Sequence, residues 1–317
     1  MTKSRGFTIA ELAVAVAVLA VLLFSAMVPF STQVELRNFA ETRRTLDTIR
    51  EAIIGFAQAN GRLPCPADGN IAFGLANAGI EKFDGTNCVA ALGGGAFGVV
   101  PWATLGVSET DSWGKRFSYR VSPAFADAIT QNTWQSRSTA VPATFTSQNT
   151  PAILSPGDQN PTCPPSSLPA VAPFTVSPVP AQSSFALCTL GDITVYTRSG
   201  PGLAAAPLVS IVPAIVISHG KNGFGAWQAS GIQLPFPANP AASDERVNAN
   251  GGATAPTPGY LTWAFFSRTP TPSAGCADPV PPAAGSSSTP LCEFDDIVVT
   301  ISTNALIARM IAAGKLP

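Results

Sequence analysis

The chain has 317 residues, and its 18 basic and 19 acidic side chains leave a net charge of −1. Only 12% of the residues are charged and they form no basic patch, which excludes electrostatic binding of nucleic acid as the main function. The length allows one large domain or two small ones beyond an anchor, and 30 prolines with 27 glycines predict long loops.

The N-terminus combines a short basic head, residues 1–6, with an apolar run over residues 7–30. About 20 apolar residues span a bilayer as a helix, so the run predicts a transmembrane segment. It is too long for the apolar core of an ordinary secretory signal. The basic head is expected to stay in the cytoplasm, with the rest of the chain on the outer side.

Glu11 is the only charged residue of the apolar run. A carboxylate at such a depth costs about 2.5–3.5 kcal/mol on insertion scales and therefore needs a partner. The sequence offers no obvious partner within the same helix, and the nearest cations are Lys3 and Arg5 of the head. One alternative is a plain membrane anchor that carries an incidental glutamate.

The segment from Lys3 to Leu12 reads Lys-Ser-Arg-Gly-Phe-Thr-Ile-Ala-Glu-Leu. It resembles the processing site of type IV pilins and type II secretion pseudopilins. The resemblance implies that a prepilin peptidase cuts after Gly6 and methylates the new amino terminus at Phe7. Glu11 then corresponds to the carboxylate that this family carries at its fifth mature position.

Cleavage would create an α-amino group with a pKa of about 8, which is mostly cationic at neutral pH. In a filament, this cation can pair with Glu11 of a neighbouring subunit inside an apolar bundle. A buried charge is tolerated when it is paired and costly when it is alone. The pair is therefore expected to set the register between subunits more than to add stability.

From Gln33 onward the apolar run gives way to an amphipathic pattern with helical spacing. Its apolar positions are Leu36, Phe39, Leu46, Ile49, Ile53 and Phe56. Asn60 and Gly61 predict the end of the helix, and Pro64 cannot continue it. A single helix over residues 7–60 would be about 80 Å long. Pro29, which corresponds loosely to the helix-bending proline of the pilin family, is expected to kink it.

The head, residues 61–317, is predicted to be α+β, with an antiparallel sheet packed against the long helix. The whole chain would then have the lollipop shape of a pilin. The predicted strands and the final helix are Ile193–Thr197, Leu208–Ser218, Tyr260–Phe266, Ile297–Ser302 and Ala305–Ala313. Asn222 and Gly223 predict a hairpin after the second strand.

The segment from Asp111 to Val121 predicts a turn followed by a strand. Gly114 can supply a positive φ, and Phe117, Tyr119 and Val121 alternate as in a half-buried strand. The segment resembles the Asp-x-Trp-Gly-x-x-aromatic-x-Tyr hairpin of major pseudopilins, although any tryptophan-anchored hairpin has the same pattern.

Loops are predicted in three places. A region rich in Ser, Thr, Pro and Ala near residues 131–190 indicates an insertion. Ala238–Pro258 and Pro270–Pro290 are also predicted to be loops.

The six cysteines are expected to form disulfides, because the head is expected to be exported. Their sequence permits fifteen pairings, of which we expect the three that close local loops: Cys65–Cys88, Cys163–Cys188 and Cys276–Cys292. Metal binding by these residues is the weaker reading, because no C-x-x-C motif is present.

Catalytic residues are scarce. His219 is the only histidine, which leaves little material for a Ser-His-Asp triad or a multi-histidine metal site. It is predicted to be a turn residue with local hydrogen bonds, and the chain is not expected to be an enzyme.

Glu293, Asp295 and Asp296 form the only tight acidic cluster of the head. Major pseudopilins carry a calcium site in their C-terminal loops, so the resemblance implies a calcium site at Asp295 and Asp296, completed by carbonyls near Asn222. Calcium needs six to eight oxygen ligands. The favoured alternative is a solvated strand start without a metal, so no cofactor is expected.

The resemblance implies a structural subunit of a type IV pilus or a type II secretion pseudopilus. Its size and insertions favour a minor subunit, held in the bacterial inner membrane with its head in the periplasm. The implied partners are other pilin or pseudopilin subunits, the prepilin peptidase, the inner-membrane assembly platform and membrane lipid. The alternative is an adhesin-like or ligand-binding head displayed on a pilin stalk.

Overall fold

The computed structural model describes residues 9–89, 96–128, 183–185, 191–199, 204–236, 244–257, 260–269 and 293–316, without the side chains of 21–32 and 254–262. Several predictions lie outside these residues. They concern Gly6 and Phe7, most of the insertion near 131–190, the loop 270–290, and the cysteines Cys163, Cys188, Cys276 and Cys292.

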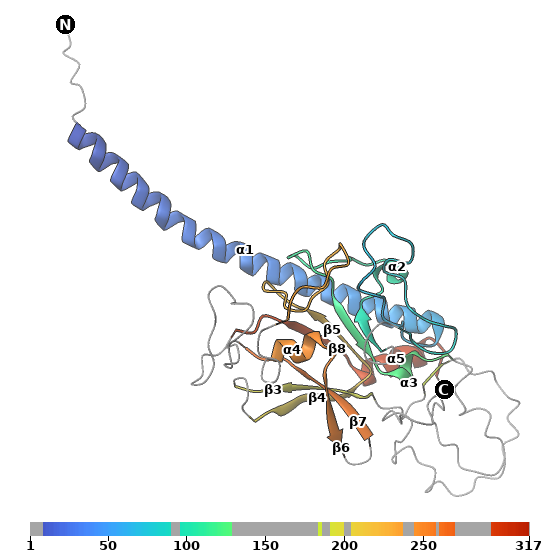
Figure 1. Cartoon of the computed structure of the whole chain (residues 1–317). Coiled ribbons are helices and arrows are strands. Elements are labelled where there is room, and N and C mark those ends of the chain that lie inside the picture. The colour runs from blue at the N-terminus through green and yellow to red at the C-terminus, as the bar shows by residue number, and fades with distance from the viewer. Residues whose placement is uncertain are drawn as a thin grey trace, which may run out of the picture.

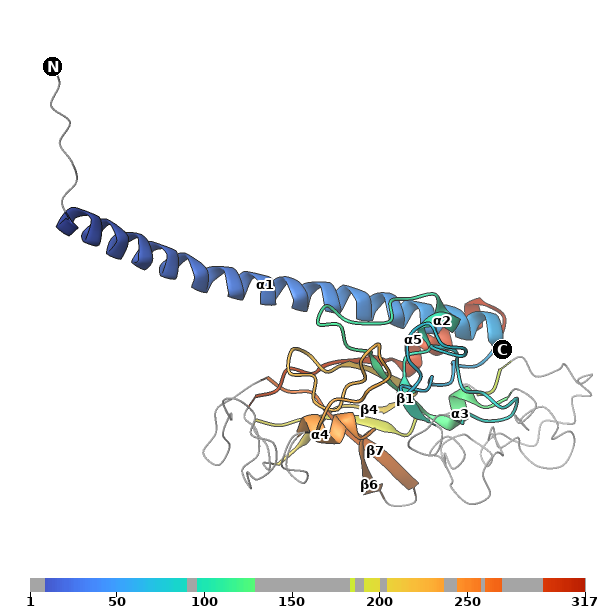
Figure 2. The ribbon, with the colours of Figure 1, turned by 45° about the horizontal axis from the view of Figure 1, so that its top comes forward.

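The longest element is α1 (Ile9–Asn60), a continuous helix of 52 residues that ends where Asn60 and Gly61 predicted. The helix is continuous through Pro29, and Figures 1 and 2 show a gently curved helix in place of the predicted kink. Its N-terminal half projects away from the rest of the chain (Figure 1). Within the described residues, no helix combines the length and the apolar composition needed to cross a membrane.

The C-terminal half of α1 supplies one wall of the main core. Leu46, Ile49 and Ile53 are fully buried and pack with residues of the sheet and of α5 (Thr303–Ala312). These three residues belong to the amphipathic stripe of the sequence, so the predicted apolar face packs on the head from Leu46 to Ile53, whereas Leu36 of the same stripe is 66% exposed.

The first sheet lies against α1 and is antiparallel throughout, as predicted. It has the order β1 (Phe97–Val99), β2 (Ser118–Val121), β5 (Ala214–Ser218) and β8 (Ile297–Ile301). Phe117, Tyr119 and Val121 face the core with α1. Ser118 and Arg120 alternate with them but are also buried, so the prediction of a half-buried strand is wrong. The reason is a second layer on the other side of the sheet.

That second layer is a mixed sheet that the sequence did not predict. Its order is β4 (Ala206–Val212), β3 (Ile193–Thr197), β7 (Tyr260–Phe266) and β6 (Ala253–Thr257), and β3 pairs with β7 in parallel. Ile193 and Phe265 of this sheet pack against Ile215 and Ile217 of the first one, which forms a separate core between the layers.

The predicted strand over residues 208–218 is two strands that belong to different sheets. Ile211 has a φ of 61°, which interrupts the extended backbone just before Pro213. A β-branched residue rarely adopts positive φ, and a proline cannot donate to a sheet ladder. The chain therefore leaves β4 and crosses to the other layer as β5.

Three short helices complete the described elements: α2 (Trp102–Leu105), α3 (Pro123–Ala126) and α4 (Asp244–Ala249). The prediction of a loop over residues 238–258 is wrong, because α4 and β6 both lie within it. The final helix is confirmed as α5, which turns Leu306 and Met310 into the main core.

Two local predictions are settled by contacts near α1. Cys65 and Cys88 form a disulfide with their Cα atoms 5.3 Å apart, so this pairing is confirmed. The turn at Gly114, with a φ of 76°, is also confirmed. It presents Trp113 edge-on to Phe39 of α1, with ring centroids 5.3 Å apart, and so fastens the turn to the long helix.

The hairpin predicted at Asn222 and Gly223 is only partly correct. The backbone N–H of Gly223 donates to the carbonyl of His219 and closes a turn, with a φ of 63° at the glycine. The turn does not join two paired strands, since β5 pairs with β2 and β8.

Candidate functional site

Glu11 lies in the first turn of α1, at the end of the helix farthest from the head. A negative charge in this position is favoured by the helix dipole. The apolar side chains around it are largely open to solvent, with 89% of Ile9, 60% of Leu12 and 64% of Val14 exposed. Within the residues that the structure describes, this end of the helix is therefore an exposed apolar surface that carries one acid.

A second site candidate is the acidic cluster at the start of β8. Asp295 and Asp296 meet Glu245 of α4, and one oxygen of each carboxylate lies within 4.8 Å of the other two. Sequence reasoning missed Glu245, because the segment that contains it was predicted to be a loop. No local spacing signal connects it to β8.

The turn after β5 does meet this cluster, as expected. The backbone N–H of Asn222 donates to Asp295 Oδ2 over 2.8 Å, and the side-chain amide of Asn222 donates to both oxygens of Glu245. The backbone N–H of Asp295 also donates to Glu245, over 3.0 Å. Asp296 is buried and Asp295 half-buried, whereas Glu293 is exposed, so the predicted solvated strand start is correct for Glu293 alone.

Burial and mutual repulsion disfavour ionisation in this cluster. Burial, followed by the charges of Asp296 and Asp295, raises the pKa of Glu245 well above its usual value. Burial likewise raises the pKa of Asp295 to about 6, although its hydrogen bond from Asn222 acts in the opposite direction. Glu245 and Asp295 thus resist ionisation.

Lys115 supplies a positive charge beside the cluster. Its ammonium group donates to the carbonyl of Gly220 over 2.8 Å and to that of Lys221. Burial lowers the pKa of Lys115, while the charges of Asp111 and Asp295 counteract that shift. The carbonyls that were expected to complete a calcium site are therefore already engaged.

These residues do not fit a calcium ion well. Calcium takes six to eight oxygen ligands. The three carboxylates have six oxygens, and five of these already have hydrogen-bond partners in Asn222, His219, Asn248 and the Asp295 backbone. We expect millimolar calcium to leave the melting temperature of the full chain unchanged near neutral pH, as followed by tryptophan fluorescence. A rise in melting temperature that a chelator reverses would contradict this expectation.

His219 lies at the centre of a buried hydrogen-bond chain. Its Nε2 is 2.8 Å from Ser118 Oγ and its Nδ1 is 3.2 Å from Asp296 Oδ1. Asn248 then donates to the other oxygen of Asp296 over 2.8 Å. The prediction of local hydrogen bonds is wrong, because the partners of His219 come from β2 and from the residue before β8.

These hydrogen bonds follow the order of a Ser-His-Asp triad, which a sequence with a single histidine did not suggest. Ser118 and His219 are both 0% exposed, however, so a substrate cannot reach the hydroxyl. A nucleophile needs access as well as a base. We therefore assign these hydrogen bonds a structural role. They form a buried polar link that joins β2, the end of β5, β8 and α4.

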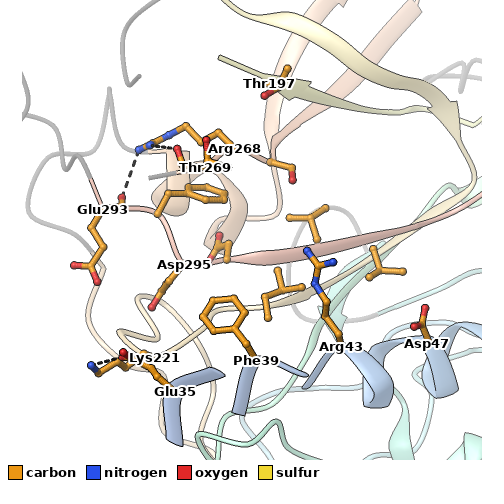
Figure 3. Close-up of a pocket in the computed structure, with 16 residues that line it drawn as sticks. Glu35, Phe39, Arg43, Asp47, Thr197, Lys221, Arg268, Thr269, Glu293 and Asp295 are labelled. Carbon is orange, nitrogen blue, oxygen red and sulfur yellow. Dashed lines mark hydrogen bonds and ion pairs between the residues drawn. The ribbon is translucent and has the colours of Figure 1, made fainter. Parts of the chain in front are cut away.

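The third candidate is a pocket of about 690 Å³ beside the acidic cluster. Figure 3 shows Phe39, Arg43 and Asp47 of α1 on one side and Thr197 and Arg268 on the other. The start of β8 passes between these two walls. The lining residues are Glu35, Phe39, Arg43, Asp47, Thr197, Lys221, Ser267, Arg268, Thr269, Glu293, Phe294, Asp295, Asp296, Ile297, Val298 and Val299.

Comparison of the chain with protein-family models, with curated proteins and with solved structures finds no match in any of the three.

Proposed function

We propose that this chain is a minor subunit of a type IV pilus or a type II secretion pseudopilus. It would be made with the leader 1–6, cut after Gly6 by a prepilin peptidase and methylated at Phe7. Before assembly it would sit in the bacterial inner membrane, with its head in the periplasm. Its partners would be membrane lipid, the assembly platform and other pilin or pseudopilin subunits.

The observation that carries this proposal is the form of α1. The helix is 52 residues long; its second half is built into the core of the head, and its first half projects with exposed apolar side chains. Such a surface favours a lipid or protein environment over water. The proposal takes the whole apolar run 7–30 from the sequence, and the structure describes the side chains of 9–20 within it.

The deciding experiment is mass spectrometry of the amino terminus of the chain purified from cells with active processing machinery. We expect the mature chain to begin at Phe7 and to carry one methyl group on its amino nitrogen. Recovery of a chain that still begins at Met1 would refute the proposal. A host that lacks the prepilin peptidase provides the control, because it should yield only the uncut form.

We expect Glu11→Ala to be processed and inserted normally but to enter filaments at least about tenfold less than the wild type. The physical reason is that the amino terminus of a neighbouring subunit would lose its counter-ion in an apolar bundle. The chain is measured by immunoblot in the sheared-filament fraction. Glu41→Ala, which removes an exposed carboxylate from the head half of α1, is the matched control. Equal incorporation of Glu11→Ala and wild type would disprove the pairing.

A structural role without catalysis is part of the proposal. It is supported by the burial of Ser118 and His219, the only described serine and histidine that hydrogen-bond in triad order.

The pocket of about 690 Å³ favours a second candidate, an adhesin-like or ligand-binding head on a pilin stalk, because pockets of this size commonly hold ligands. Deletion of the gene separates the two candidates. Loss of filaments or secretion supports the subunit role, whereas intact filaments with lost surface attachment support the binding head.

A further inference from the structure

The outer edge of β8 is a free strand edge in the described part of the chain. The sheet order places β8 at one end, and its five residues pair with β5 alone. The described backbone hydrogen bonds outside the ladders include none from Ile297–Ile301. A strand in this position presents a row of N–H and C=O groups to any chain that comes alongside.

Natural edge strands are usually protected by charges, prolines or bulges. β8 has the sequence Ile-Val-Val-Thr-Ile and contains none of these residues, and its ladder with β5 is regular. Both of its faces are occupied, since Val299 packs on the main core and Val298 on the core between the sheets. Val298, Val299 and Thr300 are only half-buried, and the surface they leave exposed is therefore on the side of the strand edge.

The pocket lies along this strand. Ile297, Val298 and Val299 line it, with α1 as one wall and the ends of β3 and β7 as the other (Figure 3). The free edge of β8 thus lies in a groove between two walls. An extended segment that entered the groove could pair with β8 and have its side chains held on both faces.

The charges of the groove favour a basic occupant. Five acidic side chains line it against three basic ones. Lys221 and Glu35 pair with each other, which leaves four acidic and two basic side chains, and Arg268 is paired with Asp244 outside the lining. Asp295 lines the groove, but its Oδ1 is buried against Gly220 and is not part of the open surface.

We propose that this groove binds an extended segment of a partner protein, which adds to β8 as a fifth strand and places a lysine or arginine side chain beside the acidic side chains of the lining, Asp295 among them. A segment of five residues spans about 17 Å and matches the length of β8. Main-chain hydrogen bonds supply affinity in this mode, and the basic side chain supplies specificity. The proposal does not depend on assembly of the chain into a filament.

The test uses the full chain in a mild detergent and a fluorescent peptide, acetyl-Thr-Val-Lys-Val-Thr-Val-amide, followed by fluorescence polarisation. We expect it to bind at least about tenfold more tightly than the same peptide with glutamate in place of lysine, which corresponds to about 1.4 kcal/mol. A third peptide with alternate backbone amides N-methylated cannot form the ladder and should lose binding. No binding of the lysine peptide at millimolar concentration would overturn the proposal.

Two variants locate the binding site. Asp295→Asn should weaken binding of the lysine peptide about five- to tenfold and should not weaken binding of the glutamate peptide. Glu51→Gln, which changes an exposed α1 carboxylate outside the groove, should leave both affinities unchanged. Equal binding by Asp295→Asn and wild type would place the peptide elsewhere and overturn the assignment, as would equal binding of the N-methylated peptide.

Discussion

Replacement of His219 by alanine should lower the free energy of unfolding by about 3 kcal/mol. The substitution leaves the hydroxyl of Ser118 and one oxygen of Asp296 without their imidazole partner, in a region where both side chains are buried. Each buried polar group that loses its partner costs about 1–3 kcal/mol, and the missing ring also leaves a cavity. The change is measured by urea unfolding of the full chain in detergent, followed by tryptophan fluorescence.

Two matched variants show whether the hydrogen bonds or the volume carry this effect. Ser118→Ala removes one bond and should cost about 1 kcal/mol. His219→Asn keeps an amide donor on the side of Asp296 and should fall between the wild type and the alanine variant. A cost below about 1 kcal/mol for His219→Ala would show that the buried hydrogen bonds of His219 add little to stability.

Asp295→Asn should raise the free energy of unfolding near neutral pH by about 1–2 kcal/mol. The pKa of Asp295 is raised to about 6 by burial, so the folded state binds a proton that the unfolded state releases near pH 4. Ionisation therefore destabilises the fold, and stability is lost as the pH rises from about 4 to about 6. Asparagine keeps an acceptor for the Asn222 N–H and removes the charge.

The measurement is the melting temperature of both chains between pH 4 and 8. The two curves should converge toward pH 4, where the aspartic acid is protonated, and the variant should melt higher above pH 6. Asp47→Asn is the control, because Asp47 is an exposed α1 carboxylate with 59% of its side chain accessible. A variant that melts lower than the wild type near neutral pH would mean that the charge of Asp295 stabilises the fold.

The elements with strong local patterns were predicted well. β3 and β7 occupy the residues that their β-branched and aromatic runs indicated, and the end of α1 falls at the predicted Asn-Gly. The disulfide between Cys65 and Cys88 was expected from the short loop that it closes. In each case the sequence pattern that predicted the feature is local, because it lies within a few turns of helix, one strand or one loop.

The misses share a physical cause. The split between β4 and β5 depends on which sheet each half joins, and α4 is a six-residue helix with no apolar period to reveal it. The parallel pairing of β3 with β7 joins strands more than sixty residues apart. Local spacing carries no information about such contacts, because they are chosen by packing between layers.

The sequence by itself determined the length of the long helix, its apolar and amphipathic halves, and the lone acid near its start, because these depend on helical periodicity and on residue type. The tertiary structure alone decided the neighbours of His219 and Asp295. Four separate segments supply Ser118, His219, Glu245 and Asp296. Only the stacking of the two sheets brings His219 within hydrogen-bond distance of Ser118 and Asp296, and places the carboxylates of Glu245 and Asp296 close enough to repel each other. The position of β8 at the edge of the described sheet is likewise decided only by the order of the strands.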